Sequence, residues 1–383
     1  MLRLHGILPV LRSSSSDSYL VTVTKDRDLP YSVRSTKALL LDDQSGITGY
    51  RAVLSRRNDV DTSDCTCDVF HLSNEYDYLN EGDIVRLHSG SGAMKCLYRR
   101  SAPSNSILLT EQCNHYCLMC SQPPKVADDS WVFKQAFELA QLIPKDTKGL
   151  ILTGGEPTLF GFKLIELLKH LKQHLPETAI HLLSNGRAFR DFELARLYAS
   201  IEHPDLMIGI PVYSDDPATH DYVVQSRGAF EETIRGILNL KKLHQRVEIR
   251  FVIHKQTVSR LRQTCEFLAR NLVFIDHVAL MALEITGFTR PNLPLLWIDP
   301  YEYRDVLSES VALLNSYGIP TSVYNHPLCT VNPDVFPNYR KSISDWKNEY
   351  LDECRPCKKQ SDCGGFFSSG KMYRHSNHIK PFV

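Results

Sequence analysis

The sequence lacks a net charge and lacks long apolar runs. Lys and Arg together number 44, as do Asp and Glu, so no overall basic field exists to attract nucleic acid or a membrane surface. No stretch approaches the roughly eighteen apolar residues that indicate a membrane-spanning helix. The apolar part of the N-terminal segment is short and broken at Pro9, which argues against a secretion signal. We therefore expect a cytoplasmic protein that binds neither nucleic acid nor a membrane.

The eleven cysteines are unevenly distributed, and one group lacks a fourth member. In a reducing compartment, clustered thiols are more often metal or redox ligands than disulfides. Cys113, Cys117 and Cys120 lie within eight residues of one another. A structural zinc site requires four ligands and disulfides require pairs, so three thiols fit neither.

Residues 1–105 predict a small β-rich domain. They contain short alternating or apolar runs separated by Asp, Gly, Ser and Arg, among them YLVTVTK, KALLLDD, GYRAVLS and GDIVRLH. That pattern is typical of small antiparallel strands. Cys65 and Cys67 have Cys-x-Cys spacing in this region, but no third or fourth ligand lies near them in the sequence. We interpret them as ordinary thiols rather than metal ligands.

Residues 106–290 alternate between strand and helix, which predicts an α/β fold with a parallel sheet. Helical stretches of about ten to fifteen residues separate six apolar strands, SILLT, GLILT, AIHLLSNG, LMIGIPV, VEIRFVIH and HVALMALE. Six units are too few for a closed eight-fold barrel, so a partial (β/α)6 barrel is favoured, with a flat doubly wound sheet as the alternative. In either fold, ligands bind at the C-terminal ends of the strands.

The three cysteines follow the first of these strands, in the sequence EQCNHYCLMC. Three thiolates hold three corners of a cubane iron–sulfur cluster and leave one iron open to an outside ligand. The turn GGEP, residues 154–157, follows the second strand. Together the two motifs resemble the radical S-adenosylmethionine (SAM) superfamily, and the resemblance covers residues 107 to about 290.

The resemblance implies a set of cofactor-binding residues. Cys113, Cys117 and Cys120 would bind a 4Fe-4S cluster whose open iron is chelated by SAM, and reductive cleavage of SAM would yield a 5′-deoxyadenosyl radical. It further implies SAM contacts for Gly154, Gly155, Glu156, Pro157, Ser184 and Asn185. The carboxylate of Glu156 is expected to face the cationic amino acid end of SAM. One departure is Met119, at a position that is usually aromatic in the family.

A zinc site is the alternative to the iron–sulfur cluster. It would use the same three cysteines and His115, which lies inside the motif. Neighbouring residues on so short a loop can hardly all converge on one ion, and zinc leaves GGEP unexplained. The cluster is therefore favoured.

Residues 291–383 are expected to form a helix and a cysteine-rich extension, with the strand–helix alternation stopping near residue 290. This region contains four cysteines, Cys329, Cys354, Cys357 and Cys363. Four thiols suit either a structural zinc or a fully ligated auxiliary iron–sulfur cluster. We favour iron–sulfur because many peptide-modifying radical enzymes carry a C-terminal auxiliary cluster. His326, His375 and His378 are alternative candidates for ligands, but we interpret them as surface residues of a loose tail.

The chain also resembles one subgroup of the superfamily. That subgroup is the C-type radical SAM maturase of the bacterial His-Xaa-Ser repeat peptide system, which is similar in LLTEQCNHYCLMCSQPPK, KSISDWKNEYLDECRPC and CGGFF. Peptide-modifying members also have segments like HDYVVQSRGAFEETIRGILNL. The resemblance implies a small precursor peptide as substrate, a sister radical SAM maturase as partner, and an electron donor such as flavodoxin or ferredoxin.

Other function classes stay open at this point. One is a radical enzyme that acts on a small molecule or on RNA, although the near-zero net charge speaks against RNA. Another is a zinc-organised scaffold without catalysis. For the β-rich domain, our hypothesis is that it grips a leader peptide by strand addition to an exposed sheet edge.

Overall fold

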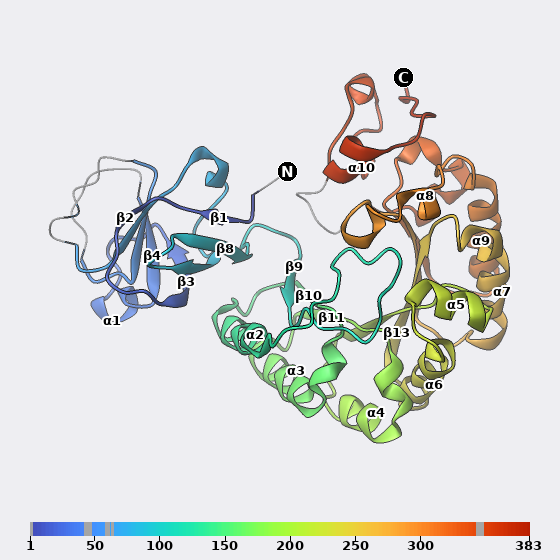
Figure 1. The fold of residues 1–383 in the computed structure, drawn as a ribbon, viewed down its shortest axis with the longest axis horizontal. Helices are drawn as coiled ribbons and strands as arrows, with labels where there is room; N and C mark the ends of the chain where they lie inside the picture. Colours follow the sequence, from blue (N-terminus) through green and yellow to red (C-terminus); the bar gives the residue numbers. More distant parts are fainter. Residues whose placement is uncertain (1–2, 42–47, 58–61, 63–64, 342–347) are drawn as a thin grey trace. The chain divides into compact units, whose positions relative to one another are not determined.

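The computed structural model in Figure 1 describes residues 3–41, 48–57, 62, 65–341 and 348–383. The chain forms two compact units, the first made of residues up to 107 with 134–148, and the second of 108–133 with 149–383. The cysteine-rich extension therefore belongs to the same compact unit as the strand–helix region. The domain boundaries near 105 and 290 stay a prediction. Asp42, Asp43 and residues 342–347, which belong to two of the segments interpreted above, lie outside the described residues.

The first unit contains an eight-stranded sheet in the order β1-β8-β7-β3-β4-β5-β6-β2. The strands are β1 (His5–Ile7), β2 (Val10–Arg12), β3 (Ser18–Thr24), β4 (Lys37–Leu41), β5 (Ala52–Ser55), β6 (Asp68–His71), β7 (Ile84–His88) and β8 (Ala93–Tyr98). The β-rich character is as predicted. The expectation of antiparallel pairing is wrong for the centre of the sheet, where β3, β4, β5 and β6 pair in parallel.

The parallel pairing follows from the connections between these strands. Parallel neighbours need a crossover of about a dozen residues or more, and the connection from β3 to β4 is of this kind and includes the short helix α1 (Tyr31–Arg34). Every residue of β5 is buried, which is typical of a strand that is covered on both faces. Cys65 and Cys67 are buried in the same core beside Leu39 and Val53.

The second unit is built around a seven-stranded sheet in chain order. The strands are β9 (Asn105–Leu108), β10 (Gly149–Thr153), β11 (Ala179–Leu183), β12 (Leu206–Pro211), β13 (Arg246–Ile253), β14 (His277–Ala282) and β15 (Thr321–Tyr324). Neighbouring strands from β10 to β15 are parallel. A doubly wound sheet reverses its strand order at a switch point, whereas this order never reverses. The predicted partial barrel is therefore confirmed over the flat alternative.

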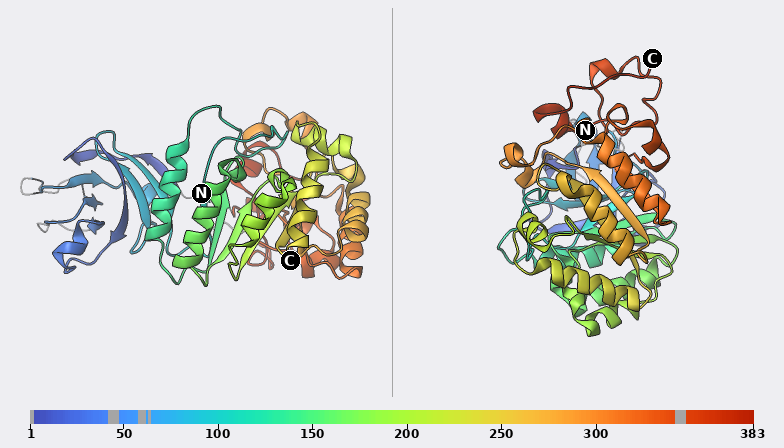
Figure 2. Two further views of the ribbon diagram at one scale, coloured as in Figure 1. Left: turned by 90° about the horizontal axis from the view of Figure 1, so that it is seen from below. Right: turned by 90° about the vertical axis from the view of Figure 1, so that its right-hand side faces the viewer.

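Helices cover the outer side of this sheet, as Figure 1 and the two views of Figure 2 show. They are α3 (Phe162–His174), α4 (Phe192–Ala199), α5 (Pro217–Val224), α6 (Ala229–Lys242), α7 (Leu261–Asn271) and α9 (Arg304–Ser316), while α2 (Ser130–Leu142) begins in the second unit and ends in the first. Each presents an apolar face to the sheet, because buried residues recur at helical spacing. In α7 these include Leu261, Cys265 and Leu268. The expectation that Cys265 is a core residue is confirmed.

The strand–helix alternation continues beyond residue 290, contrary to expectation. Helix α9 leads into β15, which pairs in parallel with β14 through Val278 to Met281. β15 has only four residues, of which three are buried. So short a run carries little periodic signal of its own and becomes a strand because the edge of β14 is there to pair with it.

The described residues also contain several short helices. They are α8 (Leu293–Leu296), α10 (Ser368–Tyr373), η1 (Asn74–Tyr76), η2 (Pro157–Phe160), η3 (Arg187–Arg190), η4 (Val258–Arg260), η5 (Gly287–Thr289), η6 (Leu328–Thr330), η7 (Pro333–Asn338) and η9 (Asp352–Cys354). None of the helices in the described ranges combines the length and apolar character required to cross a bilayer.

Candidate active site

A large cavity opens at the C-terminal ends of the barrel strands. It encloses about 1200 Å³, including space open to solvent. Residues at the ends of β10 to β14 form its wall, together with the loop that carries Cys113, Cys117 and Cys120. In such sheets the C-terminal ends of the strands are where ligands bind.

The three-cysteine loop is held on two sides by hydrogen bonds. On one side, the Asn114 side-chain oxygen accepts from Asn185 Nδ2 at 2.6 Å, and the Asn114 carbonyl accepts from Arg187 Nη1 at 3.2 Å. On the other side, the backbone N–H of Leu118 donates to the carbonyl of Val223 in α5 at 2.9 Å. These contacts fix the loop to the ends of two different barrel units.

The segment that follows β14 also holds this loop, and sequence reasoning missed it. The Phe288 amide donates to the Cys120 carbonyl at 2.8 Å, and the Thr289 hydroxyl donates to the Met119 carbonyl at 3.2 Å. Gly287 has a φ of 51°, and a Cβ there would lie 2.2 Å from the Cys120 carbonyl oxygen. The available signal was a glycine in the sequence TGFT just after the sixth strand, where only glycine fits so close a contact.

The glycines of GGEP pack against the strand end that precedes the cysteines. A Cβ on Gly154 would lie 2.6 Å from the Thr110 carbonyl oxygen, and one on Gly155 would lie 2.0 Å from that of Gln112. The Gly155 amide donates to the Thr110 carbonyl at 2.8 Å. Both glycines also line the cavity. Their lack of a side chain therefore brings the two motif turns together at the cavity wall.

Glu156 is completely buried behind this wall. One carboxylate oxygen accepts from the Thr158 amide at 2.9 Å, from the Thr158 hydroxyl at 2.5 Å and from the Ser184 hydroxyl at 2.8 Å. The other accepts from the Asn185 amide at 2.6 Å. Burial raises the pKa of this carboxyl group, while the donated hydrogen bonds lower it. In this structure the carboxylate ties the turn after β10 to the turn after β11.

The three thiols of the loop are partly buried. Burial raises the pKa of Cys113 to about 11, and it raises the pKa of Cys117 and Cys120 as well. Metal ligation requires thiolates, so binding of iron here would release protons. His115 lines the same cavity, and burial lowers its pKa to about 3, with contributions from the charges of Arg187 and His220.

Arg250 on β13 brings a positive charge to the cavity wall. Its Nη1 donates to Glu248 Oε1 at 2.6 Å, and its Nη2 lies 3.2 Å from Met281 Sδ. Glu248 is hydrogen-bonded to His277 Nδ1 at 2.8 Å. Burial acts to raise the pKa of Glu248, but the hydrogen bond from His277 and the charge of Arg250 outweigh burial and lower it to about 2. An ionised carboxylate thus fixes the guanidinium in place.

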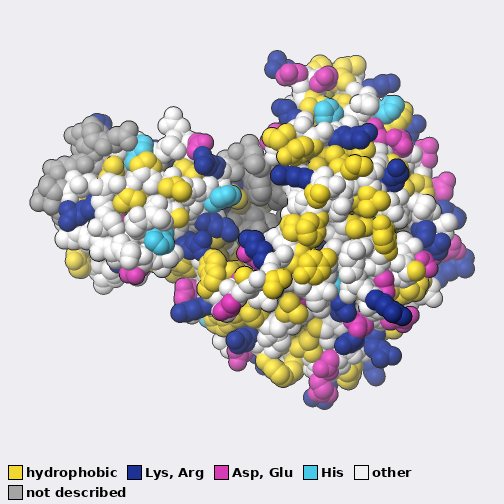
Figure 3. Space-filling model, in the orientation of Figure 1, with side chains coloured by type: hydrophobic (Ala, Val, Ile, Leu, Met, Phe, Trp, Pro, Cys, Tyr) yellow, Lys and Arg dark blue, Asp and Glu magenta, His cyan; other side chains and the backbone are white. Residues whose placement is uncertain are grey.

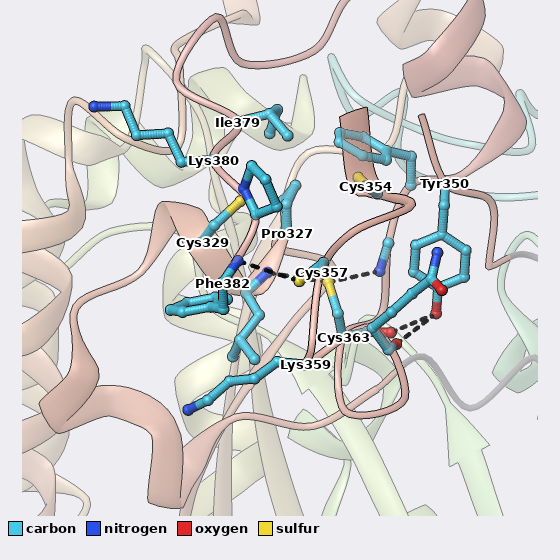
Figure 4. A pocket seen from close by; sticks show the side chains of 15 residues that line it. Pro327, Cys329, Tyr350, Cys354, Cys357, Lys359, Cys363, Ile379, Lys380 and Phe382 are labelled. Carbon is cyan, nitrogen blue, oxygen red and sulfur yellow. Dashed lines mark hydrogen bonds between the residues drawn. The ribbon is translucent and has the colours of Figure 1, made fainter. Parts of the chain in front are cut away.

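The four C-terminal cysteines surround a second, smaller cavity, as Figure 4 shows. It encloses about 370 Å³, and its lining is almost entirely apolar apart from the four thiols. The tail closes it, since Ile379, Lys380 and Phe382 also contribute to the lining. Cys329, Cys354, Cys357 and Cys363 are therefore brought together from four separate points of the chain.

Backbone amides point at the sulfurs of this second cavity. The amides of Leu328 and Gly365 each donate to Cys363 Sγ at 3.3 Å, and the amide of Phe382 donates to Cys357 Sγ at 3.4 Å. Such N–H···S bonds stabilise thiolates and tune the potential of ligated clusters. The chemistry of the lining therefore fits a thiolate-ligated metal group. Within the described part of the chain, however, no three His, Cys, Asp or Glu side chains are arranged to hold a metal ion.

The histidines of the C-terminal region are not all surface residues, contrary to expectation. His326 is fully buried, and its ring contacts the Tyr303 hydroxyl at 2.9 Å and the Tyr324 carbonyl oxygen at 2.7 Å. Burial lowers its pKa to about 4. His378 is exposed and stacks on Tyr301 with ring centroids 4.1 Å apart. The burial of His326 follows from the unforeseen strand β15, which precedes it directly.

Comparison with known families identifies the barrel. Residues 107–268 match the family model of the radical SAM superfamily. This segment is similar to the radical SAM domain that the family model describes. It runs from the first barrel strand into α7, and it includes both the three-cysteine loop and the GGEP turn.

Several solved structures show partial similarity to the chain. SuiB of Streptococcus suis bound to S-adenosylmethionine is 16% identical, with a TM-score of 0.48 over 65% of this chain and 55% of SuiB. Native anSMEcpe with bound AdoMet is 15% identical, with a TM-score of 0.49 over 72% of this chain and 92% of anSMEcpe. Coproporphyrinogen III oxidase from Escherichia coli is 14% identical, with a TM-score of 0.44 over 57% and 54% of the two chains. This chain thus spans little more than half of the length of SuiB.

The predicted SAM contacts of the radical SAM domain fall into two groups. Gly154, Gly155, Ser184 and Asn185 line the cavity, whereas Glu156 and Pro157 are buried behind it. Met119, which replaces the usual aromatic residue, also lines the cavity. The cofactor-binding roles of these residues stay a prediction, as do the metal-ligand roles of the seven clustered cysteines.

Proposed function

We propose that this chain is a radical SAM enzyme that modifies a ribosomally made peptide in the cytoplasm. The observation that carries the proposal is the arrangement of the three-cysteine loop. Cys113, Cys117 and Cys120 line one cavity at the strand ends, and the GGEP turn lines the same cavity. Three protein thiols at the wall of a cavity suit a cluster in which one iron has no protein ligand, because a small molecule in the cavity can then bind that iron.

Specific residues would hold the two cofactors. The three cysteines would ligate a 4Fe-4S cluster, and the walls formed by Gly154, Gly155, Ser184 and Asn185 would receive SAM. A reduced cluster of this kind supplies the electron that cleaves SAM to a 5′-deoxyadenosyl radical. Within the chain, Glu156 holds two of the turns that shape the SAM site. Met119 and Tyr213 supply an apolar part of the wall of this cavity.

The second cavity would hold an auxiliary iron–sulfur cluster. Four thiols, an apolar lining and amide donors to Cys357 and Cys363 suit a fully thiolate-ligated cluster. A structural zinc ion would use the same four cysteines. Metal analysis distinguishes the iron–sulfur cluster from the zinc ion.

The proposed substrate is a small precursor peptide of the His-Xaa-Ser repeat type. The similarity of the cysteine-bearing segments to the C-type maturase of that system supports this assignment. It also supports a sister radical SAM maturase as partner and a flavodoxin or ferredoxin as electron donor. On the face drawn in Figure 3, basic and acidic side chains of the described residues are interspersed. Such a surface suits a peptide better than RNA, which favours a continuous basic stripe.

Anaerobic purification tests the proposal. We expect iron and sulfide in amounts that match two 4Fe-4S clusters, an iron–sulfur absorption spectrum, and little zinc. With SAM and dithionite, the protein should form 5′-deoxyadenosine. Addition of a synthetic peptide of consecutive His-Xaa-Ser repeats should then yield a product of altered mass. A protein that contains only zinc and releases no 5′-deoxyadenosine would be a scaffold, and the proposal would fail.

A radical enzyme with another substrate would give a different result. It would form 5′-deoxyadenosine without altering the mass of the repeat peptide. In that case small molecules and short RNAs would replace the peptide in the same assay. The cofactor part of the proposal would stand, and the peptide part would fall.

A further inference from the structure

A third cavity lies between the two cysteine-lined cavities. It encloses about 500 Å³, including open space. It shares Glu284 and Asn325 with the large barrel cavity, and it shares Pro327 and Phe366 with the cavity of the four C-terminal cysteines. This middle cavity therefore adjoins both places where a cluster is proposed.

A groove on the surface adjoins the middle cavity from outside. It encloses about 720 Å³, including open solvent. It is formed by the segment that follows α8 and by the segment that begins in α10, near the C terminus in Figure 1. Groove and middle cavity share three lining residues, Trp297, Arg374 and His375. These three side chains form the boundary between the surface and the interior.

Two of the boundary residues are stacked on each other. The guanidinium of Arg374 lies over the indole ring of Trp297, 5.4 Å from its centroid. Arg374 is exposed and Trp297 is half-buried. A cation–π contact at an exposed position is worth about 0.5–1 kcal/mol, so the pair can open at little cost. The two side chains thus line both the groove and the middle cavity, and only a weak contact joins them.

The chemistry of the groove suits a polar peptide in extended form. Glu302 and Asp299 supply negative charge on one side, while Lys371 and Arg374 supply positive charge on the other. Met372 adds an apolar side chain that is 73% exposed. A peptide carries charged, polar and apolar side chains along one backbone, so it can contact charges of both signs and an apolar side chain together. A small metabolite or a phosphate chain matches such a groove less well.

We propose that this groove is the access route of the peptide substrate, and that the Arg374–Trp297 pair determines which peptide segments pass into the middle cavity. This inference rests on the proposed function. A peptide on this route would pass through the middle cavity and bring its reacting residue to the large cavity, where the radical would form. Arg374 and Trp297 are specificity-determining residues in this arrangement, since they contact the substrate before it reaches the cofactors.

Steady-state kinetics tests the role of the Arg374–Trp297 pair. The probe is the synthetic peptide of His-Xaa-Ser repeats, with its mass change as the readout. Arg374→Ala should raise the KM for the probe about two- to fivefold, with kcat changed less than about twofold, because a contact made before the chemical step is lost. The matched control is Arg304→Ala. Arg304 stacks over Tyr301 at 3.7 Å, and neither residue lines the groove or the middle cavity. An unchanged KM in Arg374→Ala, or an equal rise in the control, would overturn the inference.

Photocrosslinking tests the groove without reference to activity. A benzophenone amino acid in place of Met372 should crosslink the probe. The control places it at Phe162 in α3, whose side chain is 71% exposed and remote in sequence from the groove. Crosslinking at 372 but not at 162 supports the access route, whereas crosslinking at neither position or equally at both overturns it. If the probe is crosslinked but not modified, the proposed reaction fails while the binding groove stands.

Discussion

The backbone amide of Asn185 donates a 2.6 Å hydrogen bond to the carboxylate of Glu156. This bond joins two motifs that the sequence presents as separate, the GGEP turn after β10 and the SNG turn after β11. Because Asn185 also donates to Asn114 in the three-cysteine loop, a chain of hydrogen bonds runs from the buried carboxylate to the cysteines. Glu156, although it does not line the cavity, thus holds in place the turns that form its wall.

Replacing this carboxylate tests its positioning role. In Glu156→Gln the new NH2 group would face hydrogen-bond donors instead of accepting from them. We expect unfolding free energy to fall by about 1–3 kcal/mol, the usual cost of an unsatisfied buried polar group. SAM affinity should fall too, because Ser184 and Asn185 lose their anchor. The control Glu166→Gln, at an exposed position of α3, should change stability by less than about 0.5 kcal/mol. Urea unfolding and calorimetric SAM titration measure both effects.

The open cluster predicts a complete loss of SAM cleavage in Cys117→Ala. With only three protein ligands, removal of one leaves two irons without a protein donor, so partial activity is not expected. 5′-Deoxyadenosine formed under dithionite is the readout. Cys265→Ala is the matched control, since that thiol is buried in the core of α7. It should lower stability but retain cleavage. Normal 5′-deoxyadenosine production in Cys117→Ala would contradict the cluster assignment.

Much of the second unit could be predicted from the sequence because its signals are local. Six apolar strands alternate with amphipathic helices, and parallel strands must meet at one edge, so the cysteine loop and GGEP had to be neighbours. The four C-terminal cysteines could be grouped by count alone. The predictions that were wrong concern residues whose structure depends on partners distant in the sequence. The four residues of β15 become a strand only against β14, and His326 is buried only because β15 carries it inward.

In the first unit, too, the prediction was wrong where the structure depends on contacts distant in the sequence. Its strands were identifiable, but their parallel pairing was not, since the direction of a neighbour is set by the path of the connection. A better signal was present in KALLL and AVLS, which are continuously apolar rather than alternating and are buried accordingly. The role of Glu156 was likewise hidden. Its motif indicates that a carboxylate is needed, whereas only the structure shows which donors use it.

Acid should destabilise the protein through its buried histidines. Burial lowers the pKa of His254 to about 3 and that of His326 to about 4. Since unfolding restores an ordinary pKa near 6.5, the unfolded state binds more protons between about pH 6.5 and 4. Stability is therefore fully present above pH 6.5 and falls as the pH drops, with a slope of at most about 1.4 kcal/mol per pH unit for each histidine.

Urea unfolding at several pH values checks this prediction. His326→Gln should lower stability at pH 7.5, because the contacts with Tyr303 and Tyr324 are weakened, yet it should make the pH slope shallower. His378→Gln is the control at an exposed position and should leave the slope unchanged. An identical slope in His326→Gln and the parent protein would show that this imidazole does not contribute.

The C-terminal cysteines give the prediction that separates iron from zinc. Cys354→Ala combined with Cys357→Ala removes two of four ligands, so iron content should fall to about one cluster per chain. Cleavage of SAM without peptide should persist, because the three-cysteine loop is unchanged, while peptide product should disappear. The matched control is the double change of Cys65 and Cys67 to Ala, since these are core thiols of the first unit and should leave iron unaltered.

Loss of bound zinc with unchanged iron would make the site structural, and undiminished peptide turnover would make it dispensable. The apolar lining and the amide of Phe382 donating to Cys357 favour the iron–sulfur outcome, because that amide would stabilise a thiolate bound to a cluster, and its hydrogen bond holds the tail at the cavity.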